Sequence, residues 1–345
     1  MLLYSLTYYQ VMPSFVDFLL PFGKQDYPRD FHFSGLRHET RLSVDEKALQ
    51  LKELGRSGHD FRMCYNLKSV ETSTSQENWQ WSIRQTATYH SFDIGTGKAF
   101  WTIIKGDQLI KRRIKSATDP KTHPNLDLVT SPSLAFEATL STHLIIFDWC
   151  GESWRWYINH IEEAQQAITR RALLMSFDRP ANRPSPSPHR AATSPPTNTI
   201  KRTLTKIVRR AASATGTLTP SIPMTARPSP SVPPPDFEQD PDNNESFSFS
   251  HLQDVQFYEE KVNEALLILE SNINILTSIT VFYEDLFVNA DFPGQIIRDC
   301  SGHLTRFRKT TMGIVDDLNI QRSRARMLLS TITDRKSLVS LTLFL

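Results

Sequence analysis

Three short motifs begin like parts of enzyme sites. His38-Glu39 starts a paired-histidine zinc motif, but Leu42 stands where the second ligand is needed. Gly151-Glu-Ser-Trp-Arg155 starts a nucleophile elbow, but arginine replaces the glycine that permits the strained turn. Gly95-Thr-Gly-Lys98 lacks the spacing and the following helix of a phosphate-binding loop. We therefore expect no enzyme, with no catalytic and no cofactor-binding residues, and interpret Ser153 as a helix N-cap and 93–97 as a hairpin turn.

Residues that could bind a metal are few and scattered. The sequence contains three cysteines: Cys64, Cys150 and Cys300. Their spacing matches neither a zinc site nor a disulfide framework, and their odd number favours a reducing compartment. His90 lies between aromatic residues in a predicted strand, so we interpret it as a hydrogen-bonded core histidine. Carboxylates that could hold Mg²⁺ with the help of waters are Asp148, Asp316 and Asp317. Exposed acidic pairs are common, so these residues alone assign no metal site.

The charge of the chain is unevenly distributed. The net charge is +2, yet residues 179–235 contain nine Lys or Arg and no Asp or Glu. Residues 178–246 also hold 14 of the 21 prolines. A segment of this composition cannot bury enough apolar surface to offset its ordering entropy. We predict a disordered basic linker over 179–246.

The linker has two interpretations beyond a solvated spacer. Residues 200–211 place apolar side chains on one helical face among cations, which favours binding to an anionic membrane surface. The same charges would suit nuclear import or nucleic acid, and we do not expect nucleic acid to be the partner. The candidate anionic-surface contacts are Lys201, Arg202, Lys206, Arg209 and Arg210. The candidate phosphorylation sites, which would cancel this charge, are Ser185, Ser187, Ser194, Ser213, Thr219 and Ser229.

Hydrophobic periodicity indicates which elements position these residues. The predicted strands are 31–33, 61–67, 79–87, 99–104 and a short buried strand at 144–147, with a hairpin turn at 93–97. The predicted helices are 44–54, 107–114, 133–140 and 154–175. All six tryptophans fall within 79–156, where we expect an aromatic core. The pattern predicts an α+β fold whose N-terminal mixed α/β domain contains a β-hairpin.

Two long runs of apolar periodicity follow the linker, at 255–287 and 297–332, and Asp291-Phe-Pro-Gly294 separates them. They predict an antiparallel helical hairpin with a coiled-coil seam, each helix about 38 residues and roughly 55 Å long. The exposed part of the seam should pack on another chain or on the 154–175 helix. We find no run of about 20 apolar residues that would cross a membrane.

Several motifs resemble the CorA-like transporter-domain proteins of filamentous fungi, a divergent branch of the CorA magnesium-transporter superfamily. The motifs are Met12-Pro-Ser-Phe15, Asp30-Phe-His-Phe-Ser-Gly35, Arg37-His-Glu39, Trp81-Ser-Ile-Arg-Gln-Thr-Ala87, Tyr89-His-Ser-Phe92, Phe147-Asp-Trp149, Trp154-Arg-Trp-Tyr-Ile158 and Asp334-Arg-Lys-Ser-Leu338. The resemblance implies an α/β domain at 12–178 and a stalk-like helical hairpin at 247–338. Residues 1–11 would then be an N-terminal extension and 339–345 an apolar stub, where full members continue into two transmembrane helices.

The resemblance also sets expectations for function. The Gly-Met-Asn tripeptide of CorA pores is absent, and the nearest string, Thr311-Met-Gly313, lies in a predicted helix. We therefore expect a pore-less cytoplasmic module, able to lie at a membrane surface, that oligomerises with itself or with full-length family members. Mg²⁺ is the cofactor that the resemblance suggests. The alternative is a signalling module whose phosphorylatable linker binds anionic membrane.

Overall fold

The computed structural model describes residues 2–23, 33–43, 50–73, 79–105, 108–118, 131–175 and 249–344. These residues belong to one compact unit, formed by Met1–Phe177 and Phe247–Leu345. Its helices are α1 (Leu2–Tyr8), α2 (Phe15–Leu19), α3 (Gln108–Ala117), α4 (Pro132–Gly151), α5 (Trp154–Met175), α6 (Phe249–Val288) and α7 (Gly294–Phe344), with short 3₁₀ turns at Leu20–Phe22 and Lys52–Leu54. Its strands are β1 (Leu36–Arg41), β2 (Asp60–Thr72), β3 (Trp81–Asp93) and β4 (Ala99–Ile104).

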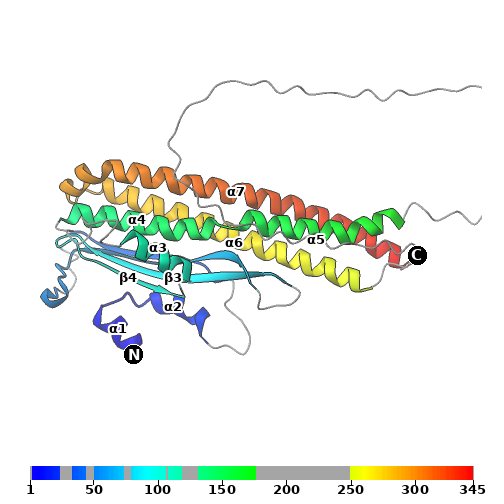
Figure 1. Ribbon diagram of the computed structural model, residues 1–345. Helices are drawn as coiled ribbons and strands as arrows, with labels where there is room; N and C mark the ends of the chain where they lie inside the picture. Colours follow the sequence, from blue (N-terminus) through cyan, green and yellow to red (C-terminus); the bar gives the residue numbers. More distant parts are fainter. Residues whose placement is uncertain are drawn as a thin grey trace, which may run out of the picture. The chain divides into compact units, whose positions relative to one another are not determined.

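The four strands form one antiparallel sheet in the order β1-β2-β3-β4 (Figure 1). The two central strands pair over 13 residues each, from Asp60 opposite Asp93 to Thr72 opposite Trp81. The predicted hairpin is confirmed, since β3 and β4 pair directly and Ala99 lies opposite Phe92. The α+β class is therefore confirmed, and every sheet contact is between neighbours in the sequence.

Helices cover both faces of the sheet (Figure 1). On one face, which we call the inner face, Phe61 and Tyr65 of β2 and Phe92 of β3 are fully buried in a core shared with α4 to α7. On the opposite, outer face, Cys64 and Tyr89 lie in a smaller core with Phe15, Leu6 and other residues of the N-terminal helices. Alternation along each strand assigns successive side chains to opposite faces. Both faces of β2 are buried: the inner face is largely apolar, and the outer face also carries Asp60, Arg62 and Lys68.

The predicted helical hairpin is also confirmed. Helices α6 and α7 pack along each other, and the turn between them is held by Asn289, whose side chain accepts a 2.9 Å hydrogen bond from the backbone N–H of Asp291. Helices α4 and α5 lie against α7. The 154–175 helix thus covers part of the seam, which was one of the two partners predicted for it. Helix α7 is longer than predicted, since it continues to Phe344.

Three element predictions were wrong in detail. Residues 144–147 are not a strand but part of α4, because a short apolar run cannot be distinguished from buried helix by periodicity. Phe33 lies outside the sheet, and β1 begins at Leu36 instead; residues 31 and 32 lie outside the described residues. Of the helix predicted at 44–54, the described part contains a single 3₁₀ turn that ends at Gly55, whose left-handed φ of 63° a helix cannot continue.

An asparagine of α6 closes the edge of β2. On the β1 side, no strand among the described residues pairs with β2 at Lys68, and Asn272 supplies a partner there. Its Oδ1 accepts from the Lys68 N–H at 3.2 Å, and its Nδ2 donates to the Lys68 carbonyl at 2.7 Å. The Lys68 ammonium is buried and donates to the Phe33 carbonyl at 2.7 Å. Burial lowers the pKa of Lys68 to about 8, an effect that Glu264 partly opposes.

One described helix, α6, is long and apolar enough to span a membrane by length and composition. We did not expect such a segment from the sequence. More than half of its apolar window, 56%, is buried inside the fold, where Leu269, Leu276 and Tyr283 are fully covered. A buried core helix passes the same test as a membrane helix, so α6 by itself is weak support for a membrane span.

Candidate functional site

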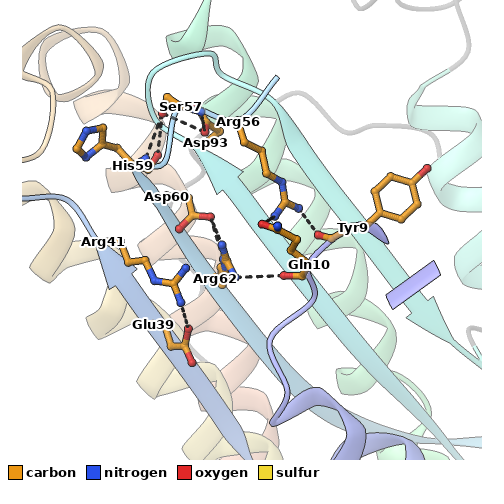
Figure 2. Close-up of polar contacts among 10 residues, drawn as sticks. All are labelled: Tyr9, Gln10, Glu39, Arg41, Arg56, Ser57, His59, Asp60, Arg62 and Asp93. Carbon is orange, nitrogen blue, oxygen red and sulfur yellow. Dashed lines mark hydrogen bonds and ion pairs between the residues drawn. The ribbon is translucent and has the colours of Figure 1, made fainter. Parts of the chain in front are cut away.

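Charged side chains gather at one end of the outer sheet face (Figure 2). Asp60 and Arg62 project from β2, and their register partners on β3 are Asp93 and Ser91. The loop before β2 contributes Arg56, and the chain between α1 and α2 passes over these strands at Tyr9 and Gln10 (Figure 2). Three segments that are far apart in the sequence thus meet at this end of the sheet.

Asp93 organises the loops around this cluster. Its Oδ1 accepts from the backbone N–H of Thr96 at 2.8 Å and from the Thr96 hydroxyl at 2.9 Å. Its Oδ2 accepts from the backbone N–H of Ser57 at 2.6 Å and from the Ser57 hydroxyl at 3.0 Å. One carboxylate therefore holds both the β3–β4 turn and the loop before β2. The turn predicted at 93–97 is confirmed. Because each Asp93 oxygen already accepts two hydrogen bonds, this carboxylate is not available to coordinate a metal.

Asp60 and Arg62 form a buried ion pair. Their side chains are 7% and 6% exposed, and both the Nη2 and the Nε of Arg62 contact the same Asp60 oxygen, at 2.7 and 2.8 Å. The other oxygen, Oδ1, is buried and receives no hydrogen bond from the described residues. Arg62 also donates to the Gln10 carbonyl at 3.1 Å. The pair thus ties the N-terminal segment to the sheet.

Arg56 has no carboxylate partner within ion-pair distance among the described residues. Its guanidinium donates to the Tyr9 carbonyl and, at 3.5 Å, to the Gln10 side chain. Gln10 adopts a left-handed φ of 51°, a turn that presents both neighbouring carbonyls to the two arginines. Burial and repulsion from Arg62 lower the pKa of Arg56, while Tyr89, Asp60 and Asp93 oppose the shift. This is the response expected of a cation that lacks counter-charge.

A cavity of about 230 Å³ opens beside this cluster. Arg56, Lys98, Asp60 and Asp93 supply its charged lining, and the rest is Tyr9, Leu54, Ser91, Ala99 and Phe100. The Tyr9 and Phe100 rings stack with their centroids 4.3 Å apart. The sequence analysis did not single out Arg56, Asp60 or Arg62. The strand alternation that places residues 60 and 62 on one face was the available signal, but it does not reveal which loop closes over them.

The inner sheet face contains a second polar group, which is fully enclosed. His143 of α4 bridges two tyrosines, with Nδ1 2.9 Å from the Tyr65 hydroxyl and Nε2 2.8 Å from the Tyr283 hydroxyl. Burial lowers the pKa of His143 to about 3, so the ring is neutral and one tyrosine donates to it while the other accepts. This triad links β2, α4 and α6. It has no opening to solvent and is a packing feature.

The prediction for His90 was wrong in one respect. His90 is fully buried as expected, but neither ring nitrogen has a hydrogen-bond partner among the described residues. The ring instead stacks on Trp101, with centroids 4.1 Å apart. Burial, and the neighbouring His143, lower its pKa well below the ordinary value. Stacking inside the aromatic core replaces the hydrogen bond that we expected.

The structure separates the other residues singled out from the sequence. Asp148 lies on α4 and Asp316 and Asp317 on α7, all with exposed side chains. Partial desolvation by the surrounding atoms still raises the pKa of Asp148. Within the described ranges, no three His, Cys, Asp or Glu side chains are close enough to hold a metal ion. Three cysteines are buried and form no disulfide: Cys64, Cys150 and Cys300. Ser153 precedes α5 with a φ of 68°, and its carbonyl accepts the first helical hydrogen bonds.

Five of the six tryptophans lie in the predicted aromatic core, spread along its length: Trp79 and Trp81 contact Tyr157, and Trp101 stacks on His90. Trp156 is 60% exposed. Thr311-Met-Gly313 lies inside α7. The linker residues proposed for anionic surfaces and for phosphorylation lie outside the described residues: Lys201, Arg202, Lys206, Arg209, Arg210, Ser185, Ser187, Ser194, Ser213, Thr219 and Ser229.

The long helices expose apolar side chains. On α6 these include Leu267, Val281 and Val288, with exposed fractions of 45%, 47% and 86%. Their spacing in multiples of seven places them on one side of the helix. On α7, Met312, Ile320 and Met327 are likewise exposed. We call these six residues the helical surface.

Arginines of α7 bind α5 beside this surface. Arg324 donates to the Asn159 side chain at 2.7 Å and lies 3.3 Å from a Glu162 carboxylate oxygen. Arg335 donates to Gln165 and Thr169, both buried, at 3.0 and 2.6 Å. A cavity of about 240 Å³ lies between these arginines, and both arginines are engaged in holding the two helices together.

Comparison with known proteins places the chain in a family. The sequence pattern of the CorA-like transporters matches residues 1–173, half of the 345-residue chain. No curated protein and no solved structure matches it. The matched half includes the whole sheet, the N-terminal segment with Tyr9 and Gln10, and most of α5. The chain belongs to the CorA-like transporters.

Proposed function

We propose that this chain is a non-conducting cytoplasmic module of a CorA-like protein that associates, with itself or with full-length family members, through its long helices. The observation that carries the proposal is the helical surface. Single exposed apolar residues are ordinary, so the proposal rests on their repetition: three recur at intervals of fourteen and seven along α6, and three more lie on the adjacent α7.

The burial of α6 supports a non-conducting role. This helix is the described element with the length and composition of a membrane span, yet its apolar residues form the core between the sheet and α7. Phe282 and Tyr283 contact Phe61 of the sheet, with ring centroids 5.7 and 5.9 Å apart. Moving α6 into a bilayer would expose the inner sheet face, so the helix serves the fold in this chain.

Magnesium would act between copies in this proposal. The described residues of one copy bring no three metal ligands together, but Asp316 and Asp317 are exposed on α7 close to Met312 and Ile320. Mg²⁺ keeps most of its waters and needs only one or two protein carboxylates. An acidic pair at the edge of an association surface would suffice to make assembly sensitive to the ion.

The test is the mass of the purified full chain by light scattering, with and without millimolar Mg²⁺. The double variant Leu267→Glu/Val281→Glu places two charges on the helical surface and should convert an oligomer into a monomer. Leu134→Glu is a matched control, because Leu134 is 47% exposed and lies on α4, outside the helical surface. This control should keep the mass of the wild type.

The outcomes separate the parts of the proposal. A Mg²⁺-dependent oligomer that the double variant abolishes supports both the association and the role of the ion. An oligomer that ignores Mg²⁺ supports association alone. A monomeric wild type under both conditions overturns the proposal and shifts attention to the basic linker.

A further inference from the structure

We propose that the cavity beside Arg56 and Lys98 is a binding site for a small organic anion, whose carboxylate or phosphate group lies between the two cations. This site lies on the outer sheet face, and its ligand is independent of association through the helical surface. The cavity is half-enclosed and its volume of about 230 Å³ suits a small metabolite.

The first argument is the charge of the lining. Arg56 and Lys98 face the cavity, and neither has a carboxylate within 4 Å among the described residues. Asp93 also faces the cavity, but four neutral donors already occupy its oxygens, and Asp60 is engaged by Arg62. With Arg62 included, three cations face two carboxylates. An anion would supply the missing counter-charge and relieve the repulsion between Arg56 and Arg62.

The second argument is that the backbone makes room for the Lys98 ammonium. An ideal Cβ built on Gly55 would lie 2.3 Å from Lys98 Nζ, so this ammonium rests directly on a glycine. Gly55 also has a left-handed φ of 63°, and its carbonyl accepts a 2.7 Å hydrogen bond from the Thr96 hydroxyl. The loop and the hairpin turn are therefore joined at the point where Lys98 folds back beside Arg56.

The third argument is the apolar wall. Leu54, Ala99 and Phe100 line the cavity beside the cations, and the Tyr9 ring lies on Phe100. Tyr9 is 37% exposed, which leaves ring surface available at the rim. Small-molecule sites typically combine such apolar walls with a few convergent polar groups. The wall favours an anion with an apolar or planar body over a free inorganic ion.

The experiment is isothermal titration of the full chain at constant ionic strength with four probes. Benzoate and phenyl phosphate carry the two anionic groups on one planar body, inorganic phosphate lacks the body, and benzyl alcohol lacks the charge. We expect one of the two aromatic anions to bind more tightly than inorganic phosphate, and benzyl alcohol not to bind. The stronger aromatic anion identifies the group as carboxylate or phosphate.

The variants assign binding to the cavity. Lys98→Met and Arg56→Gln should each lower the affinity for the more tightly bound aromatic anion by about tenfold, since each removes a charge-assisted contact. Gly55→Ala should lower this affinity as well, because the new methyl group displaces the Lys98 ammonium. Lys111→Met is the matched control, an exposed lysine on α3 outside the cavity. A second control replaces Lys201, Arg202, Lys206, Arg209 and Arg210 by Gln, and both controls should bind as the wild type does.

Two results would overturn the inference. One is the absence of binding by any anionic probe at millimolar concentration. The other is binding that Lys98→Met leaves unchanged, or that the linker variant removes. Lys98 is exposed and makes no contact on which the fold depends, so this variant keeps the test valid even if Arg56→Gln loosens the N-terminal segment.

Discussion

Replacing Lys68 by methionine should stabilise the protein at neutral pH and leave it unchanged at high pH. Lys68 is 1% exposed in the middle of β2, and burial lowers its pKa to about 8 from 10.5. The folded state therefore holds the charged lysine less favourably than the unfolded chain does. The difference in pKa corresponds to about 3 kcal/mol of unfolding free energy at pH 7.

The direction with pH follows from the same shift. Below pH 8 the lysine is charged in both states and its full burial cost is present. Between pH 8 and 10.5 the folded protein loses this proton before the unfolded chain does, so the contribution of Lys68 to stability rises with pH. In Lys68→Met, this increase in stability between pH 8 and 10.5 should be absent. The Phe33 carbonyl keeps its 2.7 Å hydrogen bond from Asn66, and Glu264 keeps Lys261 at 3.1 Å, so the substitution orphans neither group.

The assay is urea unfolding of wild type and Lys68→Met at pH 7 and at pH 10.5. We expect the variant to be more stable by roughly 1 to 3 kcal/mol at pH 7, with the difference shrinking towards zero at pH 10.5. The tyrosines and cysteines are the same in both proteins, so the difference in unfolding free energy between wild type and variant reports on Lys68. Lys111→Met, an exposed substitution, should change neither value. A variant less stable than the wild type at pH 7 would refute the reasoning.

Two further predictions concern buried polar groups. Asn272→Ala should lower the free energy of unfolding, measured with urea, by roughly 2 to 5 kcal/mol, because it leaves the N–H and the carbonyl of Lys68 without partners. Asn274→Ala, at an exposed position two residues on, is its control. Equal stabilities of the two variants would contradict the assigned role of Asn272. His90→Phe keeps a ring against Trp101 and removes two nitrogens that lack partners, so it should stabilise the fold at pH 7 by about 1 to 2 kcal/mol. It should also reduce the loss of stability as the pH falls below 6.5, where the unfolded chain gains a proton that the buried His90 does not. A destabilised variant with an unchanged acid profile would show that the ring has a partner.

The long, strongly patterned elements could be predicted from the sequence. Helices α6 and α7 follow from apolar spacing that persists over many turns, and the β3–β4 hairpin follows from alternation on both sides of 93–97. The strand predicted at 144–147 failed, because α4 lies between the sheet and α7 and is therefore apolar on several sides. A helix buried on several sides loses the periodicity that identifies it.

The cavity could not be predicted in the same way. Its charged residues come from the loop before β2, from β2, and from the β3–β4 turn, and the chain at Tyr9 and Gln10 closes it. No local pattern connects these positions, since each is ordinary in its own segment. Asp93 lay within the predicted 93–97 turn, and Lys98 lay within the Gly95–Lys98 string that lacks the spacing of a phosphate-binding loop. The turn chemistry of Asp93 was interpreted correctly, while its second role, holding Ser57, depends on tertiary structure.

The bond between Asn272 and Lys68 joins residues that are 204 positions apart, across the whole of 178–246. The half of the chain that carries the family's sequence pattern therefore does not cover its own core, because α6 packs against the inner sheet face and α7 packs on α4 and α6. As the protein is synthesised, the sheet and α4 emerge first, and α4 covers only part of Phe61 and Tyr65. The rest of this apolar face stays exposed until α6 follows, as transient hydrophobic surface does in larger folding chains.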